Sequence, residues 1–303
     1  MKPAETGSLV GGAQAERRKA PPRFSLPNWV GLVPFFLFSG LFLIGPMVIL
    51  ALRSLQDSDG ELTLSNYANL GSSTVIQSYG LSVRLSLTTA LVAGIFGLLL
   101  AWAAVMGGLP RPLRSGLATF SGVASNFAGV PLAAAFIFTL GRIGIVTALF
   151  EFLGVDLYRA GFSLYTFWGL VLVYLYFQLP LMVLVIMPSL DGLKREWREA
   201  SENLGASGFQ YWRFVGLPVL LPSILGAMIL LFGNAFGAHA TAYALTGGGA
   251  LRLATLLIGA QITGDVLNDP GLGYSAAMGM IFIMGLSIVI YSVLQRRSER
   301  WLA

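Results

Sequence analysis

AGFSLYTFWGLVLVYLYFQLPLMVLVIMPSL, the stretch from Ala160 to Leu190, contains no charged side chain. The hydrocarbon core of a bilayer is about 30 Å thick, and an α-helix crosses it in about 20 apolar residues. The stretch is therefore long enough to span a membrane. The composition of the whole chain agrees, because 55% of its 303 residues are hydrophobic and only 11% are charged, whereas an ordinary soluble domain has about 25% charged residues.

Five further stretches of the chain have the same character. We expect an all-α, polytopic membrane protein with one membrane domain over residues 29–295. The six predicted transmembrane helices are Trp29–Leu52, Leu85–Met106, Ser115–Gly141, Ala160–Leu190, Val219–Leu251 and Gly271–Gln295. The apolar segment Leu253–Gly264 is too short to cross, so we expect it to lie at the interface or to re-enter the membrane.

The basic residues predict how these helices face. Most of the 19 lysines and arginines lie in the N-terminal tail, in the loops after the second and fourth predicted helices, and at the C-terminus. Cytoplasmic loops carry such an excess, so both termini are predicted to be cytoplasmic. Residues 1–28 are expected to form a disordered tail, and residues 296–303 a short cytoplasmic end. Topology thus explains the basic pI, and no nucleic-acid partner is expected.

Several kinds of chemistry are excluded by residues that the chain lacks. It has no cysteine and a single histidine, His239, so disulfides, thiolate nucleophiles and Cys- or His-rich metal centres are not expected. The sequence has no G-x-x-x-x-G-K-[ST] phosphate loop. Gly247-Gly248-Gly249 lacks the Lys-Ser/Thr that would have to follow. We therefore predict no catalytic residue, no metal site and no cofactor in this chain.

The loop between the fourth and fifth predicted helices is long and highly charged. It reads DGLKREWREASENLGASGFQYWRFVGLP, from Asp191 to Pro218. A helix over Leu193–Leu204 is predicted, with Gly205 as its stop. A second short helix is predicted from an N-cap at Ser207 to Val215, with Pro218 ending it. Such an amphipathic element could dock into a groove on a soluble partner or lie on the lipid surface.

This loop also carries a spaced motif. Glu199-Ala200-Ser201 is followed after three residues by Gly205, then after nine by Val215, and then by Leu217-Pro218. The pattern resembles the signature of binding-protein-dependent ABC importer permeases, E-A-A, three residues, Gly, nine residues, an aliphatic, one residue and Leu-Pro. Ser201 stands where the signature has alanine, a small-for-small difference. The resemblance covers the chain from about Val30 to the C-terminus and does not include the N-terminal tail.

The resemblance implies a type I, methionine-permease-like fold in a bacterial cytoplasmic membrane, with ATP and Mg bound by another subunit. The short loop helix would be a coupling helix seated in a cleft of that ATPase. The implied partners are two copies of the ATPase, a second permease (a heterodimer rather than a homodimer), an extracytoplasmic substrate-binding protein and membrane lipid. The implied ATPase-coupling residues are Arg198, Glu199, Ala200, Ser201, Glu202, Gly205, Ala206 and Ser207.

Polar side chains inside the predicted helices mark a candidate path for a solute, because such groups are costly in lipid unless they are paired or face a cavity. The candidates are Asn126, Tyr174, Gln178, Asn234, His239, Thr241 and Tyr243. Asn234 and Thr241 are predicted to share one helix face, as are Tyr174 and Gln178. The same groups could instead form hydrogen bonds between helices.

The runs Tyr174–Pro180 and Ala242–Gly248 are similar to those of the spermidine/putrescine-type permease group, which also includes permeases for thiamine, ferric iron and 2-aminoethylphosphonate. The resemblance implies a substrate of this kind, most directly a polyamine. No Asp or Glu lies inside the predicted spans, so a dication would rely on aromatic rings, amides and carbonyls, or on the partner. The alternative is an ion-coupled secondary transporter or channel, against which stands the lack of intramembrane Asp, Glu or Lys for proton coupling.

Overall fold

The computed structural model describes residues 31–57, 59–249, 251–263 and 269–299, so the predicted tail at residues 1–28 lies outside the described residues. Within them, every regular element is a helix, apart from an isolated bridge between Gln56 and Leu62. Six helical runs among these residues are long and apolar enough to cross a membrane. The prediction of an all-α chain with six candidate spans is therefore confirmed. Two of the predicted spans are interrupted, and the third candidate run is Val130–Phe152 rather than the predicted Ser115–Gly141.

The chain forms two compact units, Met1–Val48 and Ile49–Ala303. The described part of the first unit contains α1 (Val33–Ser39), a π-helical turn η2 (Gly40–Ile44) and the start of α2 (Gly45–Ser54). Its phenylalanine and leucine side chains are exposed on all sides of the helix. The candidate span Val33–Ser54 begins here and ends in the second unit.

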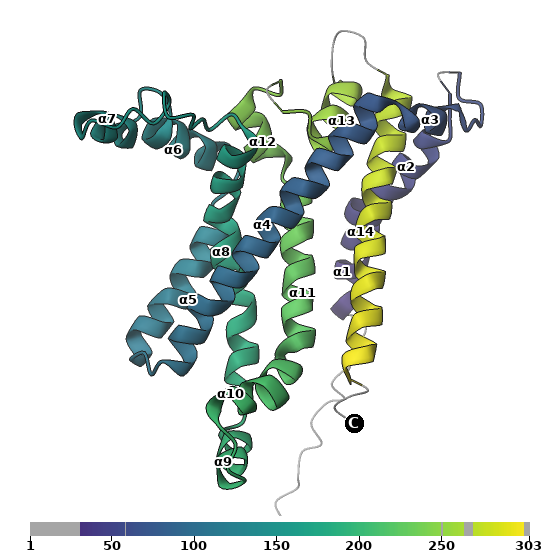
Figure 1. The fold of residues 1–303 in the computed structure, drawn as a ribbon. Helices are drawn as coiled ribbons and strands as arrows, with labels where there is room; N and C mark the ends of the chain where they lie inside the picture. Colours follow the sequence, from purple (N-terminus) through teal and green to yellow (C-terminus); the bar gives the residue numbers. More distant parts are fainter. Residues whose placement is uncertain (1–30, 58, 250, 264–268, 300–303) are drawn as a thin grey trace, which may run out of the picture. The chain divides into compact units, whose positions relative to one another are not determined.

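Four long helices organise the second unit: α4 (Ser73–Met106), α8 (Phe167–Asp191), α11 (Leu217–Phe236) and α14 (Pro270–Glu299). Helix α4 packs against α8 and α11, and α11 also packs against α14 (Figure 1). Small residues on α4 permit the close approach. A Cβ on Gly97 would lie 2.6 Å from the Cβ of Met182, and one on Gly94 would collide with the sulfur of Met228. Helix α4 begins well before the predicted Leu85.

The predicted third span, Ser115–Gly141, is wrong as a single helix. Helix α5 (Arg111–Asn126) ends at the break Phe127–Gly129, and α6 (Val130–Leu140) and α7 (Ile145–Phe152) follow. Gly129 has φ of +72°, a conformation that glycine tolerates best. Pro131 then starts α6, where a proline without N–H is accommodated. Helices α6 and α7 run across the direction of α4 and α8 rather than along it (Figure 1).

The predicted fifth span, Val219–Leu251, is also interrupted. Helix α11 ends at Phe236, and after Gly237 and Ala238 the chain restarts as α12 (His239–Thr246). The predicted common helix face of Asn234 and Thr241 is therefore wrong. The short apolar segment near residue 253 is the separate helix α13 (Ala254–Thr263), which packs on α14 and α4.

Short elements near one end of the second unit are joined through Asn66. Helix α3 (Ser65–Ala68) and the turn η3 (Asn69–Gly71) precede α4. The Nδ2 of Asn66 donates to the carbonyl oxygens of Ser54 at 3.0 Å and Gln56 at 2.9 Å, and Ser275 Oγ donates to the Asn66 carbonyl at 3.0 Å. Asn66 therefore connects the end of α2 with the start of α14.

We expect Asn66→Ala to lower the stability of the subunit by about 1–3 kcal/mol, because two carbonyl groups lose their donor in a buried site. The matched control is Asn69→Ala, an exposed asparagine three residues away. The measurement is the temperature of half-unfolding of each purified variant in detergent. Equal temperatures for the two variants would contradict the role given to Asn66.

Candidate functional site

The charged loop contains α9 (Arg195–Asn203) and α10 (Gly208–Tyr211), joined by a sharp turn. The prediction of two helices joined at Gly205 is confirmed. Pro218, however, does not end the second helix, because α10 continues through the π-helical turn η4 (Trp212–Gly216) directly into α11. The π-helical turn, in which the Leu217 N–H donates to the Trp212 carbonyl, accommodates a proline that has no N–H of its own. The loop therefore has a continuous helical connection to a candidate membrane span.

The turn between α9 and α10 is built from two local caps. Gly205 has φ of +77°, its N–H donates to the Glu202 carbonyl at 3.0 Å, and the N–H of Ala206 donates to the Ser201 carbonyl at 3.0 Å. This pair of bonds is a Schellman motif. Ser207 then forms a reciprocal capping box with Gln210. Both the predicted stop and the predicted N-cap are therefore present.

Helix α9 packs against little of the rest of the subunit. Each of its residues is exposed or half-buried, and Leu204, which follows it, is 88% exposed. Two ion pairs lie along the helix, Arg195–Glu199 at 2.8 Å and Arg198–Glu202 at 2.9 Å. Exposed pairs of this kind contribute only about 0.3–0.5 kcal/mol each, so these charges remain available to a partner. The predicted coupling residues 198–207 all lie on α9 or on its turn to α10.

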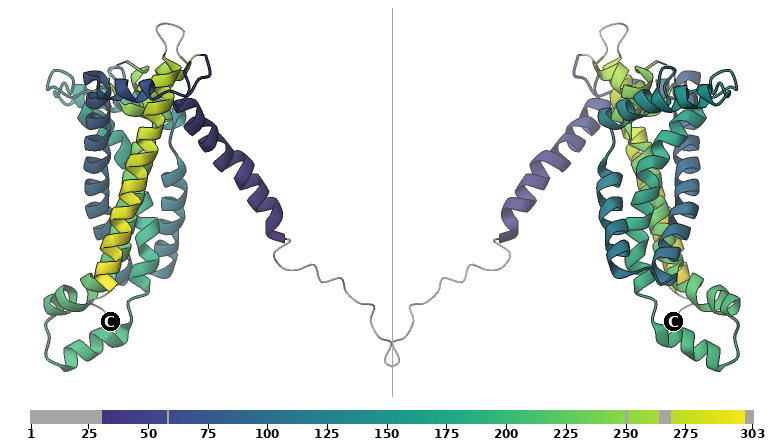
Figure 2. Two further views of the ribbon diagram at one scale, coloured as in Figure 1. Left: turned by 90° about the vertical axis from the view of Figure 1, so that its right-hand side faces the viewer. Right: turned by 90° about the vertical axis from the view of Figure 1, so that its left-hand side faces the viewer.

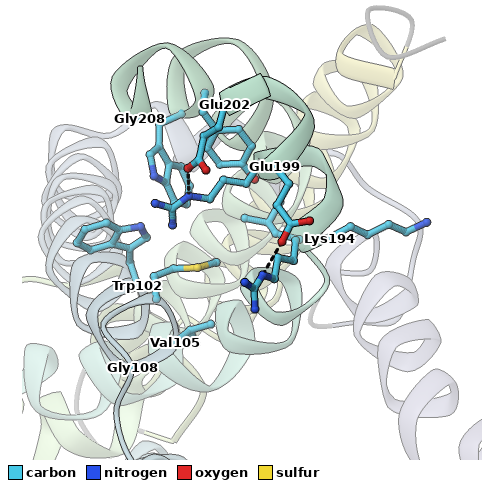
Figure 3. Close-up of a pocket in the computed structure, with 13 residues that line it drawn as sticks. Trp102, Val105, Gly108, Lys194, Glu199, Glu202 and Gly208 are labelled. Carbon is cyan, nitrogen blue, oxygen red and sulfur yellow. Dashed lines mark hydrogen bonds and ion pairs between the residues drawn. The ribbon is translucent and has the colours of Figure 1, made fainter. Parts of the chain in front are cut away.

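A cleft of about 720 Å³ separates this loop from the end of α4. Figure 3 shows Trp102 on the α4 side, with Glu199 and Glu202 on the α9 side, each in its ion pair. Trp102 and Trp212 meet edge to face inside it, with ring centroids 6.0 Å apart. The cleft thus has an aromatic wall and a charged rim. Helix α9, which lines it, lies at the end of the unit opposite α7 (Figures 1 and 2).

The second candidate site is the set of polar residues near the two helix breaks. Tyr174 and Gln178 share one face of α8, as their spacing predicted, and both side chains are buried. The Tyr174 hydroxyl donates to the carbonyl of Ala238 at 2.7 Å, in the break before α12. Gln178 Nε2 donates to the Leu231 carbonyl at 2.7 Å, and its Oε1 accepts from Asn234 Nδ2 at 3.4 Å. These groups therefore join α8 to α11 and α12.

Thr241 and His239 connect α12 to other segments. The N–H of Gly129 donates to Thr241 Oγ1 at 2.7 Å, so the break before α6 is fastened to α12. His239 Nδ1 lies 3.1 Å from the carbonyl oxygen of Thr255 in α13, and its ring stacks on Tyr243 with centroids 5.7 Å apart. Both predicted residues thus have partners inside the subunit.

Three of the predicted path residues are exposed: Asn126 at the end of α5, Asn234 near the end of α11 and Tyr243 in α12. Sequence reasoning missed Phe127, which follows Asn126 and whose ring meets that of Tyr176 edge to face at 6.0 Å. It also missed Gly129, although Gly-Val-Pro at residues 129–131 is a typical start of a helix. The exposed polar and aromatic groups lie next to the two breaks.

Residues 30–303 match the family described as the binding-protein-dependent transport system inner membrane component. The chain belongs to this family. It is therefore a multi-pass membrane permease of a transport system, and the resemblance carried by the charged loop is confirmed at this level. Transport rather than catalysis is the activity of the family.

Relatives with assigned transport functions support the same level of description. The sulfate permease CysT of Escherichia coli strain K12 is 27% identical over 222 residues, which cover 73% of this chain and 74% of that protein. A probable sulfate permease of Nephroselmis olivacea is 26% identical over 203 residues, covering 66% and 68%. The thiamine permease ThiP of Salmonella typhimurium is 30% identical over 159 residues, which cover 52% of this chain but 28% of that protein.

Among solved structures, a bacterial ABC transporter that imports the acidic polysaccharide alginate is similar with a TM-score of 0.67 and 16% identity. The match covers 90% of this chain and 94% of that chain. At this identity the likeness concerns the fold, which is that of an importer permease.

The bond between Gly129 and Thr241 can be tested with two threonines of the same helix. We expect Thr241→Val to destabilise the subunit by about 1–3 kcal/mol, because the Gly129 N–H loses its acceptor. Thr246→Val is the control, since Thr246 Oγ1 bonds only to the Ala242 carbonyl of its own helix. The measurement is thermal unfolding in detergent. If the control is the more damaging change, Thr241 does not hold the break.

Proposed function

We propose that the chain is the transmembrane permease subunit of an ATP-driven ABC importer. With a second permease it would form the path for a small polar solute that an extracytoplasmic binding protein delivers. The observation that carries the proposal is the exposed loop Asp191–Pro218, which has the spacing of the permease signature and presents α9 away from the core of the subunit. The family membership of the chain supports the same function.

The loop suits a protein partner better than a lipid surface. The charged side chains of α9 lie along one side of the helix, where four of them form two ion pairs. The other side carries one large apolar side chain, Trp197, beside the small Ala200 and Ser201, whereas a helix on a bilayer needs one broad apolar face. The apolar Leu204 follows the helix on this same side, at the tip of the turn, and is exposed. We therefore assign α9 as the coupling helix, with Leu204 entering a cleft of the cytoplasmic ATPase and Glu199 and Glu202 on the rim of the contact.

The remaining subunits follow from this assignment. ATP and Mg would be bound by two copies of the ATPase, so no cofactor is proposed for this chain. The excess of lysine and arginine near α9 and at both termini supports a cytoplasmic location for that side, in a bacterial inner membrane. A second, different permease is proposed as the other half of the path, in a heterodimer rather than a homodimer.

We place the solute path along the two helix breaks. Asn126, Asn234 and Tyr243 offer exposed polar groups there, while Tyr174, Gln178, His239 and Thr241 hold the surrounding backbone in place. Irregular backbone at membrane depth is tolerated only where it is buried in protein or lines a water-filled cavity. An ion-coupled transporter or channel remains the alternative, and it requires transport without ATP.

The substrate is proposed only by class, as a small polar solute. The similarity to the spermidine/putrescine-type group favours a polyamine or a related substrate such as 2-aminoethylphosphonate, thiamine or ferric iron. The named relatives add sulfate and again include thiamine. Thiamine is therefore the single substrate supported by both lines of comparison.

The substrate can be identified through the native complex. We expect the tagged chain to retain an ATPase and a second permease when it is purified from its own membrane, and a binding protein from the same cells to stimulate ATP hydrolysis in proteoliposomes. Mass spectrometry of the solute carried by that binding protein then distinguishes thiamine, a polyamine and sulfate. Purification of the chain alone, with ATP-independent uptake, would favour the ion-coupled alternative.

The coupling assignment predicts a loss of association in Leu204→Asp. Full burial of a leucine contributes about 1.5–3 kcal/mol, so we expect at least a roughly tenfold weaker complex with the ATPase. Co-purification of the ATPase and ATP-driven uptake are the two measurements. Leu62→Asp, at an equally exposed leucine in a different loop, should retain both. An unchanged complex in Leu204→Asp would remove Leu204 from the contact.

A further inference from the structure

Helix α7 has two faces of opposite character. Thr147 is buried, and its Oγ1 donates to the Gly141 carbonyl at 2.8 Å. On the other face, Ile145, Leu149 and Phe152 follow one another at helical spacing; Ile145 is 77% and Phe152 86% exposed. We call these three residues the α7 stripe. The helix therefore turns Thr147 toward the subunit and the α7 stripe outward, while Glu151 near its end is also exposed.

An outward apolar face of this kind is unfavourable in water, because apolar side chains gain free energy when they are removed from water. The exposed surface continues into the neighbouring segments. Ile143, in the turn before α7, is 99% exposed, and Leu153 after it is also exposed. Something apolar must cover this surface in the working protein.

The segments of the chain on either side of α7 carry side chains that are typical of a membrane boundary. Trp168 and Tyr165 are exposed nearby in the chain, at the start of α8. The Arg142 guanidinium lies 5.6 Å from the centroid of the Tyr158 ring, and Arg159 pairs with Asp156 at 3.1 Å. Tryptophan and tyrosine gather where hydrocarbon meets water, and arginine can reach the headgroups while its stem stays apolar.

The direction of α7 agrees with this location. It runs across α4 and α8 rather than along them, at the end of the unit opposite α9 (Figures 1 and 2). A helix in the membrane plane buries one apolar face in the boundary between headgroups and acyl chains. The stripe is also narrow, since it has three side chains on two helical turns. A stable protein interface uses about 20–30 residues on each side.

We propose that the α7 stripe lies in the outer leaflet of the bilayer and anchors α7 in the membrane plane. The assignment of this side as the outer one rests on the proposed function. Helix α6 leads from Gly129 to α7, and α12 packs against α6. The position of α7 in the membrane therefore sets how deep in the bilayer the break at residues 127–129 lies. The ligand of this surface is thus lipid rather than a protein.

The chain has no cysteine, so single cysteines can report the surroundings of each position. Ile145→Cys, Leu149→Cys and Phe152→Cys would each carry a spin label, with Glu151→Cys as the control on the same helix. The importer, purified with its native partners, is placed in phosphatidylethanolamine/phosphatidylglycerol nanodiscs. Collision of the label with oxygen, which concentrates in lipid, is compared with collision with a water-soluble nickel chelate.

We expect oxygen collisions to exceed nickel collisions at the three stripe positions, and the reverse at residue 151. Dominant nickel collisions on the stripe would place it in water and overturn the proposal. Protection from both reagents in the complex, with oxygen access in the isolated chain, would show that a subunit covers the stripe and would equally overturn it.

Two further measurements test the proposed function independently of the lipid contact. A membrane-impermeant thiol reagent added to right-side-out vesicles should label Glu151→Cys from outside. Labelling only after the vesicles are opened would reverse the orientation, so the lipid contact would then belong to the inner leaflet. ATP-driven uptake by the same variants shows independently whether the importer assignment holds.

Discussion

The need to pair every backbone group at an interrupted helix shapes this permease. In hydrocarbon an unpaired N–H or C=O costs several kcal/mol, yet the chain breaks at residues 127–129 and again at 237–238. Thr241 accepts from the Gly129 N–H, and the Tyr174 hydroxyl donates to the Ala238 carbonyl. Within the part of the chain that the structure describes, no buried side-chain nitrogen or oxygen lacks a partner. The two breaks are therefore fastened to each other through Thr241 and to α8 through Tyr174.

Those bonds also explain why the buried polar residues hold the helices together and do not bind a solute. Gln178 joins α8 to α11 through a backbone carbonyl, and its remaining acceptor meets Asn234. A solute that reached Gln178 would have to displace bonds that hold two helices together. Exposed groups beside the same breaks, such as Asn126 and Tyr243, can meet a solute without that loss.

The sequence predicted what local composition and spacing determine. Six apolar runs predicted the spans, and the stop at Gly205 and the cap at Ser207 were found because each depends on residues within one turn. The break at residues 127–129 was missed because Ala128, Gly129 and Val130 are as uncharged as the helices around them. The hydropathy of the sequence therefore does not change where the helix is interrupted. The start of α4 was missed because Arg84 interrupts the uncharged run, so the span was counted only from Leu85. Whether Tyr174 faces a path or a neighbouring helix depends on packing, which helical spacing alone does not contain.

The turn at Gly205 and Ser207 has a consequence for the kinetics of assembly. All of its bonds join residues within six positions of one another, so its shape does not depend on a partner. Association then has little backbone entropy to lose in this loop, and a preorganised surface keeps more of its contact energy as affinity. The loop can therefore bind a moving partner without a folding step. Its conformation does not have to form again in each cycle of binding and release.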